Sequence, residues 1–305
     1  MEYVIGLDGG GSNTTLKAAT LEQGIVFEAQ GASCNLNAAT AEQVRDNLHS
    51  LLRIFLREGY EVSECRGICL GASGAGDPQV QERLKGMLRE IFPACPIQVA
   101  HDALTALHGA FPDGIGIVII AGTGSICYGQ NVRRELVRTG GWGHVMGDEG
   151  SAYDIARQIL QAVMRSYDGR GRETVLTQGL LDYWKISSPA QIPEMVYRCG
   201  RDKKAIAAIA FLCDIGYNKG DTICHEIVDS AAQSLIELIL CTANRLSGSG
   251  EVLRCAYTGG VLDHFTDLRG RVEQRIRAHG QSVIWTGEKA DAALGCVRLA
   301  LQTQE

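Results

Sequence analysis

The sequence predicts an α/β protein made of two related domains, and three observations lead to this prediction. The chain has 305 residues, a length at which one hydrophobic core usually gives way to two. Apolar strand patterns alternate with helix patterns, which is typical of a parallel sheet covered by helices. A strand, a turn of glycine and hydroxyl residues, and a second strand occur near residue 9 and again near residue 123, as expected for a duplicated domain.

The first half of the chain is expected to open with three short strands and to continue with helices and strands in alternation. Aliphatic and β-branched residues between Gly-containing turns predict the strands. Apolar residues recur every three or four positions between Val44 and Leu56, which predicts a helix that begins near Thr40 and stops at Gly59. The other expected elements are strands 3–7, 15–20, 25–29, 67–70 and 97–100, and a helix over 79–91.

From Gly116 the pattern begins again, with a strand, a Gly-rich turn, a second strand and later a long helix. Residues 168–204 are less periodic and hold two of the six prolines, so we expect a small excursion or lid there. The expected elements of this half are strands 117–120, 125–129, 252–258 and 282–285, and helices 150–167, 226–246, 262–279 and one from residue 289.

Composition limits the classes of partner. Hydrophobic residues make up 45% of the chain and charged residues 21%, which leaves little room for extended disorder. The net charge is −6 and no cluster of Lys and Arg occurs, so the surface is not one that neutralises nucleic-acid phosphates. We therefore expect no nucleic-acid partner. A homodimer is compatible with the sequence, which does not disclose the oligomeric state.

Cysteine usage and hydropathy indicate the compartment. The eleven cysteines are scattered singly, without a CxxC pair or a zinc-type Cys/His spacing, and are expected to be reduced and mostly buried. The first residues lack a basic segment followed by an apolar one, and no run approaches the roughly 18 apolar residues that span a bilayer. These features predict a cytoplasmic protein that does not contact a membrane.

The first glycine turn, residues 8–13, reads Asp-Gly-Gly-Gly-Ser-Asn between two strands. Glycines let a backbone approach a polyphosphate, and they leave N–H groups and the Ser12 hydroxyl free to donate hydrogen bonds. Asp8 stands at the end of the strand, where it could hold Mg²⁺ through water. The alternative is a simple tight hairpin with an Asp at its first position, which is the better interpretation of one such turn taken alone.

The second glycine turn, residues 121–125, reads Ala-Gly-Thr-Gly-Ser. Two such turns at the ends of corresponding strands could hold a phosphate chain from opposite sides. Neither is a Walker A loop, because the chain contains no GxxxxGK[ST], and a dinucleotide fingerprint is disfavoured because residues 126–128 continue as a strand. The pair therefore predicts a phosphate site of another kind.

Asp102 follows a predicted strand and opens a helix, which places its carboxylate at the carboxyl edge of the sheet, where α/β proteins bind ligands. There it could accept a hydroxyl proton from a sugar during phosphate transfer. The alternative role is a helix N-cap, for which Asp is a preferred residue. Both roles can coexist.

The segment 140–150 is the most unusual stretch, with five glycines around an aromatic residue and two acids just before a helix. Such a composition suggests a ligand loop. Trp142 could stack on a sugar face and Asp148 could accept hydrogen bonds from sugar hydroxyls. Alternatively, Trp142 lies in the core, and Asp148, Glu149 and Ser151 only serve the helix N-terminus. His144 is given no role.

The segment 257–262 ends a strand with two glycines and opens a helix. This geometry would let a base and ribose lie against the backbone. Taken alone, it is only a strand-to-helix turn.

With these segments in order, the chain resembles the N-acetylglucosamine kinase branch of the sugar kinase, Hsp70 and actin superfamily, grouped with the BadF/BadG/BcrA/BcrD ATPases. The resemblance runs nearly end to end, and its most specific part is GGWGHVMGDEGSAYDIA, residues 140–156. It implies two ribonuclease H-like domains of the actin-like ATPase fold flanking a nucleotide and sugar cleft. The first would span 1–111, completed by the C-terminal helix 289–305, and the second 112–288.

The resemblance also implies roles for individual residues. Asp102 would be the general base, and Asp8 would precede the phosphate turn as in the family. Ile126 departs from the pattern, because some relatives carry a polar residue there that helps hold the sugar. The ATP contacts implied are Gly10, Gly11, Ser12, Asn13, Gly122, Thr123, Ala207, Gly259 and Gly260. The sugar contacts implied are Asn35, Asp102, Ser125, Gly141, Trp142 and Asp148.

The function this implies is transfer of phosphate from MgATP to the 6-hydroxyl of N-acetylglucosamine. Glucosamine and N-acetylmuramate are alternative substrates. A different class in the same superfamily comprises the ATPase activators of benzoyl-CoA reductase and 2-hydroxyacyl-CoA dehydratase, which need an exposed set of cysteine ligands. Those activators would give Asn35, Trp142 and Asp148 no purpose, so the sequence favours the kinase. A sugar sensor without turnover would not need the base.

Overall fold

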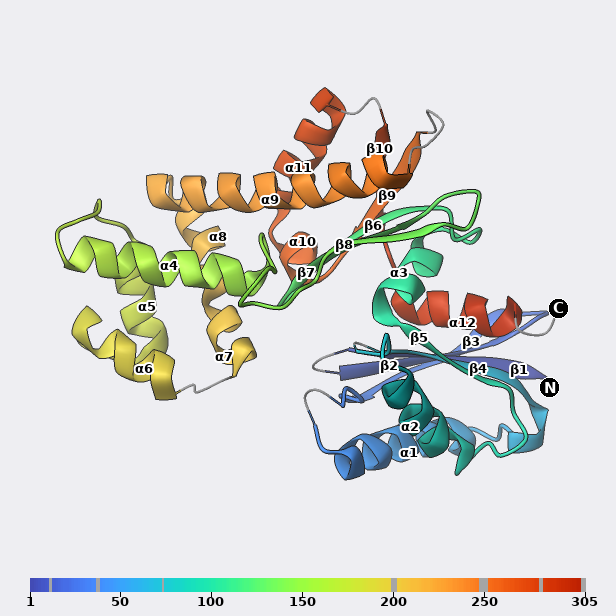
Figure 1. Ribbon diagram of the computed structural model, residues 1–305. Coiled ribbons are helices and arrows are strands. Elements are labelled where there is room, and N and C mark those ends of the chain that lie inside the picture. Colours follow the sequence, from blue (N-terminus) through green and yellow to red (C-terminus); the bar gives the residue numbers. More distant parts are fainter. Residues whose placement is uncertain are drawn as a thin grey trace. The chain divides into compact units, whose positions relative to one another are not determined.

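The computed structural model describes residues 1–10, 13–36, 39–72, 74–198, 202–246, 252–279 and 282–302 and is drawn as a ribbon in Figure 1. Its contacts divide the chain into two compact units. Unit 1 comprises Met1–Gly116 with Ala290–Glu305, and unit 2 comprises Ile117–Lys289. The C-terminal segment therefore returns to the unit in which the chain begins.

Unit 1 is built on a five-stranded sheet in the order β3-β2-β1-β4-β5. The first three strands form an antiparallel meander, and β4 and β5 continue the sheet in parallel with β1. Apolar residues alternate between the two faces of β1, so both faces are buried. The strands are β1 (Tyr3–Gly9), β2 (Asn13–Thr20), β3 (Gly24–Ala32), β4 (Cys65–Ala72) and β5 (Ile97–His101).

Helices cover both faces of this sheet (Figure 1). On one face lie α1 (Ala41–Arg57) and α2 (Pro78–Arg89), whose apolar stripes pack on the sheet in one buried cluster. On the other face lie α3 (Asp102–Ala110) and the C-terminal helix α12 (Ala292–Gln302), which contacts β1, β4 and α3. A short 3₁₀ helix, η1 (Val62–Glu64), leads into β4. The C-terminal helix thus completes the core of unit 1.

Unit 2 has a five-stranded sheet in the order β10-β9-β6-β7-β8. Read from its other edge, this is the strand order of unit 1, with β6 in the place of β1 and β9 in the place of β4. The parallel pairs β6–β9 and β9–β10 and the antiparallel pair β7–β8 match as well. The expected repeat therefore extends to whole sheets. The strands are β6 (Gly116–Ala121), β7 (Ser125–Gln130), β8 (Leu136–Gly140), β9 (Leu253–Thr258) and β10 (Val283–Lys289).

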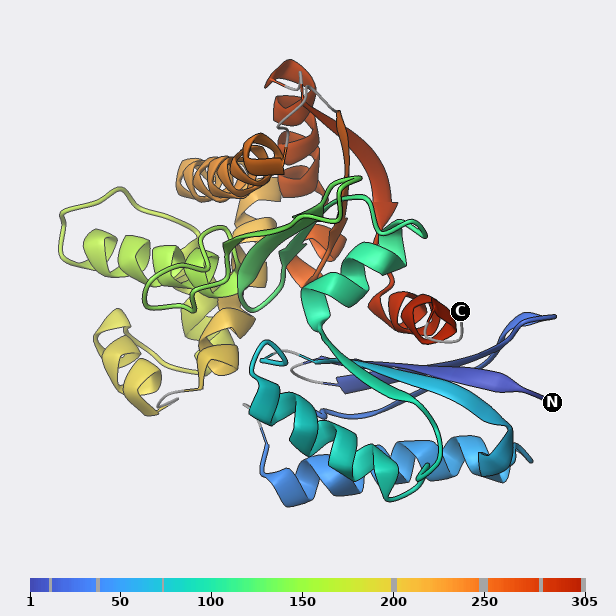
Figure 2. The ribbon, with the colours of Figure 1, turned by 45° about the vertical axis from the view of Figure 1, so that its right-hand side comes forward.

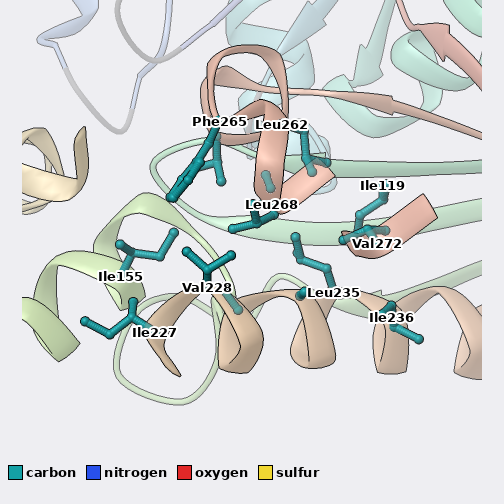
Figure 3. Close-up of a cluster of buried hydrophobic side chains, with 14 of the residues drawn as sticks. Ile119, Ile155, Ile227, Val228, Leu235, Ile236, Leu262, Phe265, Leu268 and Val272 are labelled. Atoms are coloured by element: carbon teal, nitrogen blue, oxygen red, sulfur yellow. The ribbon is translucent and has the colours of Figure 1, made fainter. Parts of the chain in front are cut away.

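The core of unit 2 is organised by the long helix α9 (Thr222–Leu246), which packs on β7, β8 and α11 (Thr266–His279). Figure 3 shows buried side chains of α9 facing those of α11, with a β6 residue beside them. Helices α4 (Ala152–Tyr167) and α10 (Gly260–His264) contribute further side chains to this cluster. The labelled members are Ile119, Ile155, Ile227, Val228, Leu235, Ile236, Leu262, Phe265, Leu268 and Val272.

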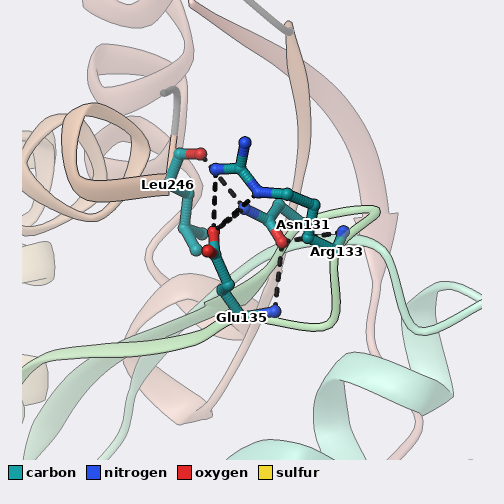
Figure 4. A network of polar contacts seen from close by, with 4 residues as sticks. All are labelled: Asn131, Arg133, Glu135 and Leu246. Carbon is teal, nitrogen blue, oxygen red and sulfur yellow. Dashed lines mark hydrogen bonds and ion pairs between the residues drawn. The ribbon is translucent and has the colours of Figure 1, made fainter. Parts of the chain in front are cut away.

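A polar network closes the turn between β7 and β8 and ties it to the end of α9 (Figure 4). The Asn131 side-chain oxygen accepts from the backbone N–H groups of Arg133 and Glu135, and its amide donates to the Leu246 carbonyl at 3.3 Å. The Arg133 guanidinium donates to the Glu135 carboxylate at 2.9 Å, which holds the pKa of Glu135 below its ordinary value. The network fixes the register of β8, the strand that leads into the segment 140–150.

Helices form in the segment 168–204, where a small excursion or lid was expected, and further helices continue to residue 218. Within residues 168–218 lie α5 (Leu176–Trp184), α6 (Ile192–Arg198), α7 (Lys203–Ala207) and α8 (Phe211–Asn218), with short 3₁₀ turns η2 (Pro189–Gln191) and η3 (Ala208–Ala210). Both ribbon views show this yellow segment beside α4 (Figure 1, Figure 2). It buries its own apolar side chains in the core of unit 2, including Leu176, Leu180, Ile192, Ile206, Ile209 and Leu212. It is therefore part of the packed domain.

Other element bounds differ in detail from the prediction. The strand β8 was not predicted, and the helix expected over 262–279 is two helices that meet at Phe265. Helix α9 begins at Thr222 rather than residue 226, and α12 begins at Ala292 rather than 289. None of the described helices has the length and hydropathy needed to cross a membrane.

Candidate functional site

The glycine turn of unit 1 is hydrogen-bonded to the loop that follows β3. The Ser33 hydroxyl donates to the Gly10 carbonyl at 2.8 Å, and the Asn35 backbone N–H donates to the Ser33 oxygen at 3.3 Å. The Asn47 side chain of α1 holds the same loop by donating to the Ser33 carbonyl at 2.8 Å. Thus Gly10, an expected ATP contact, and Asn35, an expected sugar contact, share one small network.

Not every residue of this turn can be placed. Gly11 and Ser12, two of the expected ATP contacts, lie outside the described residues. Asn13 begins β2 with an exposed side chain, and Asn35 is 7% exposed. Their roles toward ligands stay predictions.

Asp8 lies within electrostatic range of two other carboxylates of unit 1, Asp102 and Asp291. Asp8, near the end of β1, is partly buried, and burial together with the charges of Asp102 and Asp291 raises its pKa to about 7. Burial also works against ionisation of Asp291, yet the Lys17 ammonium and the Leu294 backbone N–H hold the pKa of that carboxyl below its ordinary value. The negative charges of Asp102 and Asp291 therefore act on Asp8, and none of the described cations pairs with the Asp8 carboxylate.

This arrangement fits a divalent cation near Asp8. A buried carboxylate with a raised pKa becomes easier to ionise when a cation approaches, and Mg²⁺ is bound through one or two carboxylates and several waters. Asp8 would hold the ion through water, as expected from the sequence, with Asp102 nearby. Within the described residues no compact group of three or more His, Cys, Asp or Glu ligands occurs.

Asp102 is the first residue of α3 and its side chain is 34% exposed. The helix cap is the residue before it, because the His101 side chain accepts from the Ala103 backbone N–H. The alternative that Asp102 is the N-cap of α3 is therefore wrong, because the N-cap position is held by His101 and Asp102 is the first residue of the helix. Its Oδ1 also accepts from the Ala103 N–H, at 2.9 Å, and lies 2.8 Å from His101 Nδ1.

The glycine turn of unit 2 is joined to the segment 148–152 by several hydrogen bonds. The Ser125 N–H donates to Asp148 Oδ1 at 3.2 Å, and the Ser125 hydroxyl donates to the Glu149 carbonyl at 2.7 Å. The Ala152 N–H, in the first turn of α4, donates to the Gly122 carbonyl at 2.9 Å. The second glycine turn and the segment 148–152 are therefore held together by hydrogen bonds, as the first glycine turn and the loop after β3 are in unit 1.

Asp148 is the most constrained of the expected sugar contacts. It is 4% exposed, has a φ of 62°, and pairs through Oδ2 with the Lys203 ammonium of α7. A Cβ on Gly124 would lie 2.8 Å from Asp148 Oδ1, so only glycine lets the turn approach this carboxylate. The cap of α4 is Ser151, whose hydroxyl accepts from the Asp154 N–H. The alternative that these residues serve the helix N-terminus therefore holds for Ser151, but the Asp148 carboxylate does not cap α4.

Trp142 lies on the surface, 62% exposed, so the alternative that it belongs to the core is wrong. The Arg138 guanidinium lies over one face of its ring, 4.1 Å from the centroid. None of the described acidic side chains forms an ion pair with Arg138. Gly141 packs against Ile126, the residue that departs from the family pattern, because a Cβ at Gly141 would lie 2.7 Å from Ile126 Cδ1.

The corner between β9 and α10 lies against the base of the second glycine turn. Gly259 has a φ of 100°, and a Cβ there would lie 2.5 Å from the Ala121 carbonyl oxygen. The expected adenosine contacts Gly259 and Gly260 are thus brought to the expected phosphate contacts Gly122 and Thr123. Ala207 is not joined to them by any described hydrogen bond.

Ala207 is 6% exposed, and its helix α7 packs on α4. Its role as an adenosine contact stays a prediction.

Sequence reasoning gave no role to Ser33, His101, Arg138 or Lys203. Ser33 and His101 each stand within two residues of a predicted site residue, which is a usable signal. Lys203 is 55 residues away from its partner Asp148 in the chain, and a turn separates Arg138 from its partner Trp142. Only the folded structure brings each pair together.

Comparison with known proteins agrees with this geometry. The family model described as the BadF/BadG/BcrA/BcrD ATPase family matches residues 5–297. The N-acetylmuramic acid/N-acetylglucosamine kinase of Clostridium acetobutylicum is 35% identical over 301 residues, which cover 98% of each chain. The N-acetyl-D-glucosamine kinase of Dictyostelium discoideum is 26% identical over 320 residues, covering 100% of this chain and 99% of that protein.

A solved structure shows the same fold. A proposed N-acetylglucosamine kinase from Chromobacterium violaceum superposes with a TM-score of 0.76 at 24% identity, covering 98% of this chain and 99% of that one. The expected α/β class with two sheets of the actin-like ATPase fold is confirmed, and so is the resemblance read from residues 140–156. The chain belongs to the BadF/BadG/BcrA/BcrD ATPase family.

Proposed function

We propose that this protein transfers the γ-phosphoryl group of MgATP to the 6-hydroxyl of N-acetylglucosamine, with Asp102 as the general base. The observation that carries the proposal is the coupling found in both units. In unit 1 Ser33 joins the glycine turn to the Asn35 loop, and in unit 2 Ser125 joins the glycine turn to Asp148. A phosphate-binding turn that is bonded to a sugar-binding loop can position both reactants, which is the main task of a phosphotransferase.

Asp102 suits the base in position and in access. It stands at the carboxyl end of β5, its side chain is partly exposed, and its Oδ1 is already held by the Ala103 N–H. Asp102 would take the proton from the attacking hydroxyl as the oxygen bonds to phosphorus. Backbone N–H groups of the two turns would stabilise the charge on the phosphate oxygens. Mg²⁺, held through water at Asp8, would supply charge neutralisation of the phosphates.

Both relatives named above are kinases whose names include N-acetylglucosamine, which supports this sugar as the substrate. A specific observation also favours N-acetylmuramate as a second substrate. This sugar is N-acetylglucosamine with a lactyl ether on O3, and the ether carries a carboxylate. The Arg138 guanidinium lies on Trp142 and has no described acidic partner, so it could pair with that carboxylate at a sugar stacked on the tryptophan.

A coupled assay of ADP release over a panel of sugars tests the proposal. We expect release that depends on N-acetylglucosamine and N-acetylmuramate and is weak with glucose. The 6-deoxy analogue of N-acetylglucosamine should inhibit competitively without supporting turnover, because it lacks the attacked hydroxyl. Turnover of the 6-deoxy analogue would move the reaction to another hydroxyl, and release that ignores every sugar would contradict the kinase.

The same assay separates the kinase from an ATPase activator with an iron–sulfur cluster. Of the described cysteines only Cys241 is exposed and Cys95 is half-buried. An activator would release ADP without sugar and would be isolated as a brown, iron-containing protein. A colourless preparation with sugar-dependent release supports the kinase.

A further inference from the structure

The junction between β5 and α3 places a histidine directly against the proposed base. His101 ends β5 and caps α3, and its Nδ1 lies 2.8 Å from Asp102 Oδ1. Both atoms also approach the backbone N–H of Ala103, at 3.1 Å from Nδ1 and 2.9 Å from Oδ1. Three polar atoms therefore meet at one point, and the N–H of Ala103 has only one proton to share.

The position of a second proton follows from this geometry. If Nδ1 carried no proton, its lone pair would face the lone pairs of a carboxylate at 2.8 Å, and only the single N–H of Ala103 would be shared between them. A proton on Nδ1 turns the same contact into a hydrogen bond of ordinary length, donated to Asp102 Oδ1. A protonated Nδ1 cannot accept from the Ala103 N–H, so that N–H then donates to Oδ1 alone, and this oxygen accepts two hydrogen bonds.

We propose that His101 is a positioning residue for the base, holding Asp102 through an Nδ1–H to Oδ1 hydrogen bond. The inference rests on the proposed role of Asp102. With Oδ1 held by two donors, the carboxylate is fixed about its χ2 angle and Oδ2 is the oxygen left to accept the hydroxyl proton. No residue in the described part of the chain donates to Oδ2.

The surroundings give this bond a purpose. Asp8 lies close enough for the Asp102 charge to raise its pKa, so the two carboxylates repel each other when both are ionised, and a second donor opposes rotation of the Asp102 carboxylate. The two side chains are 27% and 34% exposed, so His101 holds the base without covering it. His101 acts on Asp102 and not on the substrate.

Three substitutions of His101 separate positioning from capping. His101→Ala removes the donor to Asp102 together with any side-chain atom that could cap α3. His101→Ser restores a preferred N-cap, but its hydroxyl stands one bond closer to the backbone and falls short of Asp102. His101→Asn puts an amide N–H at the place of Nδ1 and is also a good cap. Steady-state kinetics with N-acetylglucosamine and thermal unfolding are measured for each variant.

We expect kcat to fall about 10- to 100-fold in the Ala and Ser variants, the size typical of a misplaced catalytic group. The KM values for ATP and sugar should stay within about twofold, because positioning of the base acts on the chemical step. The Asn variant should recover kcat to within about threefold of the wild-type value, since it restores the donor. The Ser and Asn variants should both unfold at the wild-type temperature.

Three results would each overturn the inference: a wild-type kcat in the Ala variant, an Asn variant no more active than the Ser variant, or a loss confined to KM. Asp102→Asn keeps this result distinct from a failure of the proposed function. If Asp102→Asn is inactive while His101→Ala is fully active, the base stands and the positioning role fails; if Asp102→Asn is active, the proposed base itself fails.

Discussion

The hydroxyl of Ser33 donates a hydrogen bond to the carbonyl of Gly10 at 2.8 Å, which joins the loop of an expected sugar contact to a turn of expected ATP contacts. The Ser33 oxygen also accepts from the Asn35 N–H, so one side chain holds both segments. Ser33 is not itself a proposed contact of ATP or of the sugar. The positions of both ligands at unit 1 should nevertheless depend on it.

Replacing Ser33 by Ala should weaken both substrates together. Loss of a hydrogen bond of this kind costs about 1 kcal/mol, so we expect the KM values for ATP and for N-acetylglucosamine each to rise roughly 3- to 10-fold. Ser33→Thr keeps the hydroxyl and serves as the control. A change in only one of the two KM values would show that the turn and the loop are independent.

Replacing Asp8 by Asn should stabilise the protein without ligands and impair the enzyme. The pKa of Asp8 is raised from 3.8 to about 7, so between these values the folded protein binds more protons at this site than the unfolded chain does. The free energy of unfolding therefore falls as the pH rises from about 4 to about 7, and the loss is complete above that window. Asn cannot ionise, so the substitution removes this pH-dependent loss of stability.

We expect Asp8→Asn and wild-type protein to unfold at similar temperatures near pH 4, and the variant to unfold at least about 2 °C higher at pH 8 without Mg²⁺ or nucleotide. Turnover should fall, because the proposed holder of Mg²⁺ is lost. Asp46→Asn, at an exposed carboxylate of α1, is the control and should show no such pH-dependent difference. Equal unfolding temperatures for Asp8→Asn and wild type at pH 8 would contradict the assignment of this cost to Asp8.

The ion pair between Lys203 and Asp148 should stabilise unit 2. Asp148 is 4% exposed, so Lys203→Met would leave a buried carboxylate without its cation, at a cost of about 3–5 kcal/mol. Adding Asp148→Asn should recover part of this loss, since an amide needs no cation and Asn tolerates the φ of 62°. Thermal unfolding of the two single variants and the double variant measures the coupling. Strictly additive effects would mean that the pair contributes nothing.

The choice between two amino sugars should depend on Arg138. Arg138→Gln removes the cation proposed to meet the lactyl carboxylate, so kcat/KM for N-acetylmuramate should fall about tenfold or more relative to that for N-acetylglucosamine. Arg133→Gln, which removes an exposed arginine paired with Glu135 on the neighbouring turn, is the matched control. An unchanged ratio would remove Arg138 from substrate selection.

Much of the fold could be predicted because its signals are local. Apolar periodicity defined α1, α4 and α9, and the repeated pattern of strand, glycine turn and strand indicated two related sheets, which the identical strand order confirms. Strand β8 was missed because Leu136–Gly140 is mostly exposed or half-buried and carries no clear alternation. The helices between residues 176 and 218 were missed because they are short and gain their stability from packing into the core of unit 2.

The site was predicted less completely, for a physical reason. Glycines and acids that follow strands can be recognised in the sequence, so the two glycine turns, Asp102 and Asp148 could be predicted as site residues. The groups that hold them could not. Lys203 reaches Asp148 across 55 residues of chain, and the exposure of Trp142 depends on how its loop leaves β8, so both are decided by tertiary structure.

The turnover of Asp102→Asn tests the central claim most directly. Asn has the shape of Asp and keeps an oxygen for the Ala103 N–H, but it cannot take a proton from the sugar. We predict that kcat with N-acetylglucosamine falls about 10²- to 10⁴-fold, while the Kd for MgATP stays within about twofold of wild type because Asp102 serves the sugar hydroxyl and not the nucleotide. Turnover close to the wild-type rate would contradict the account.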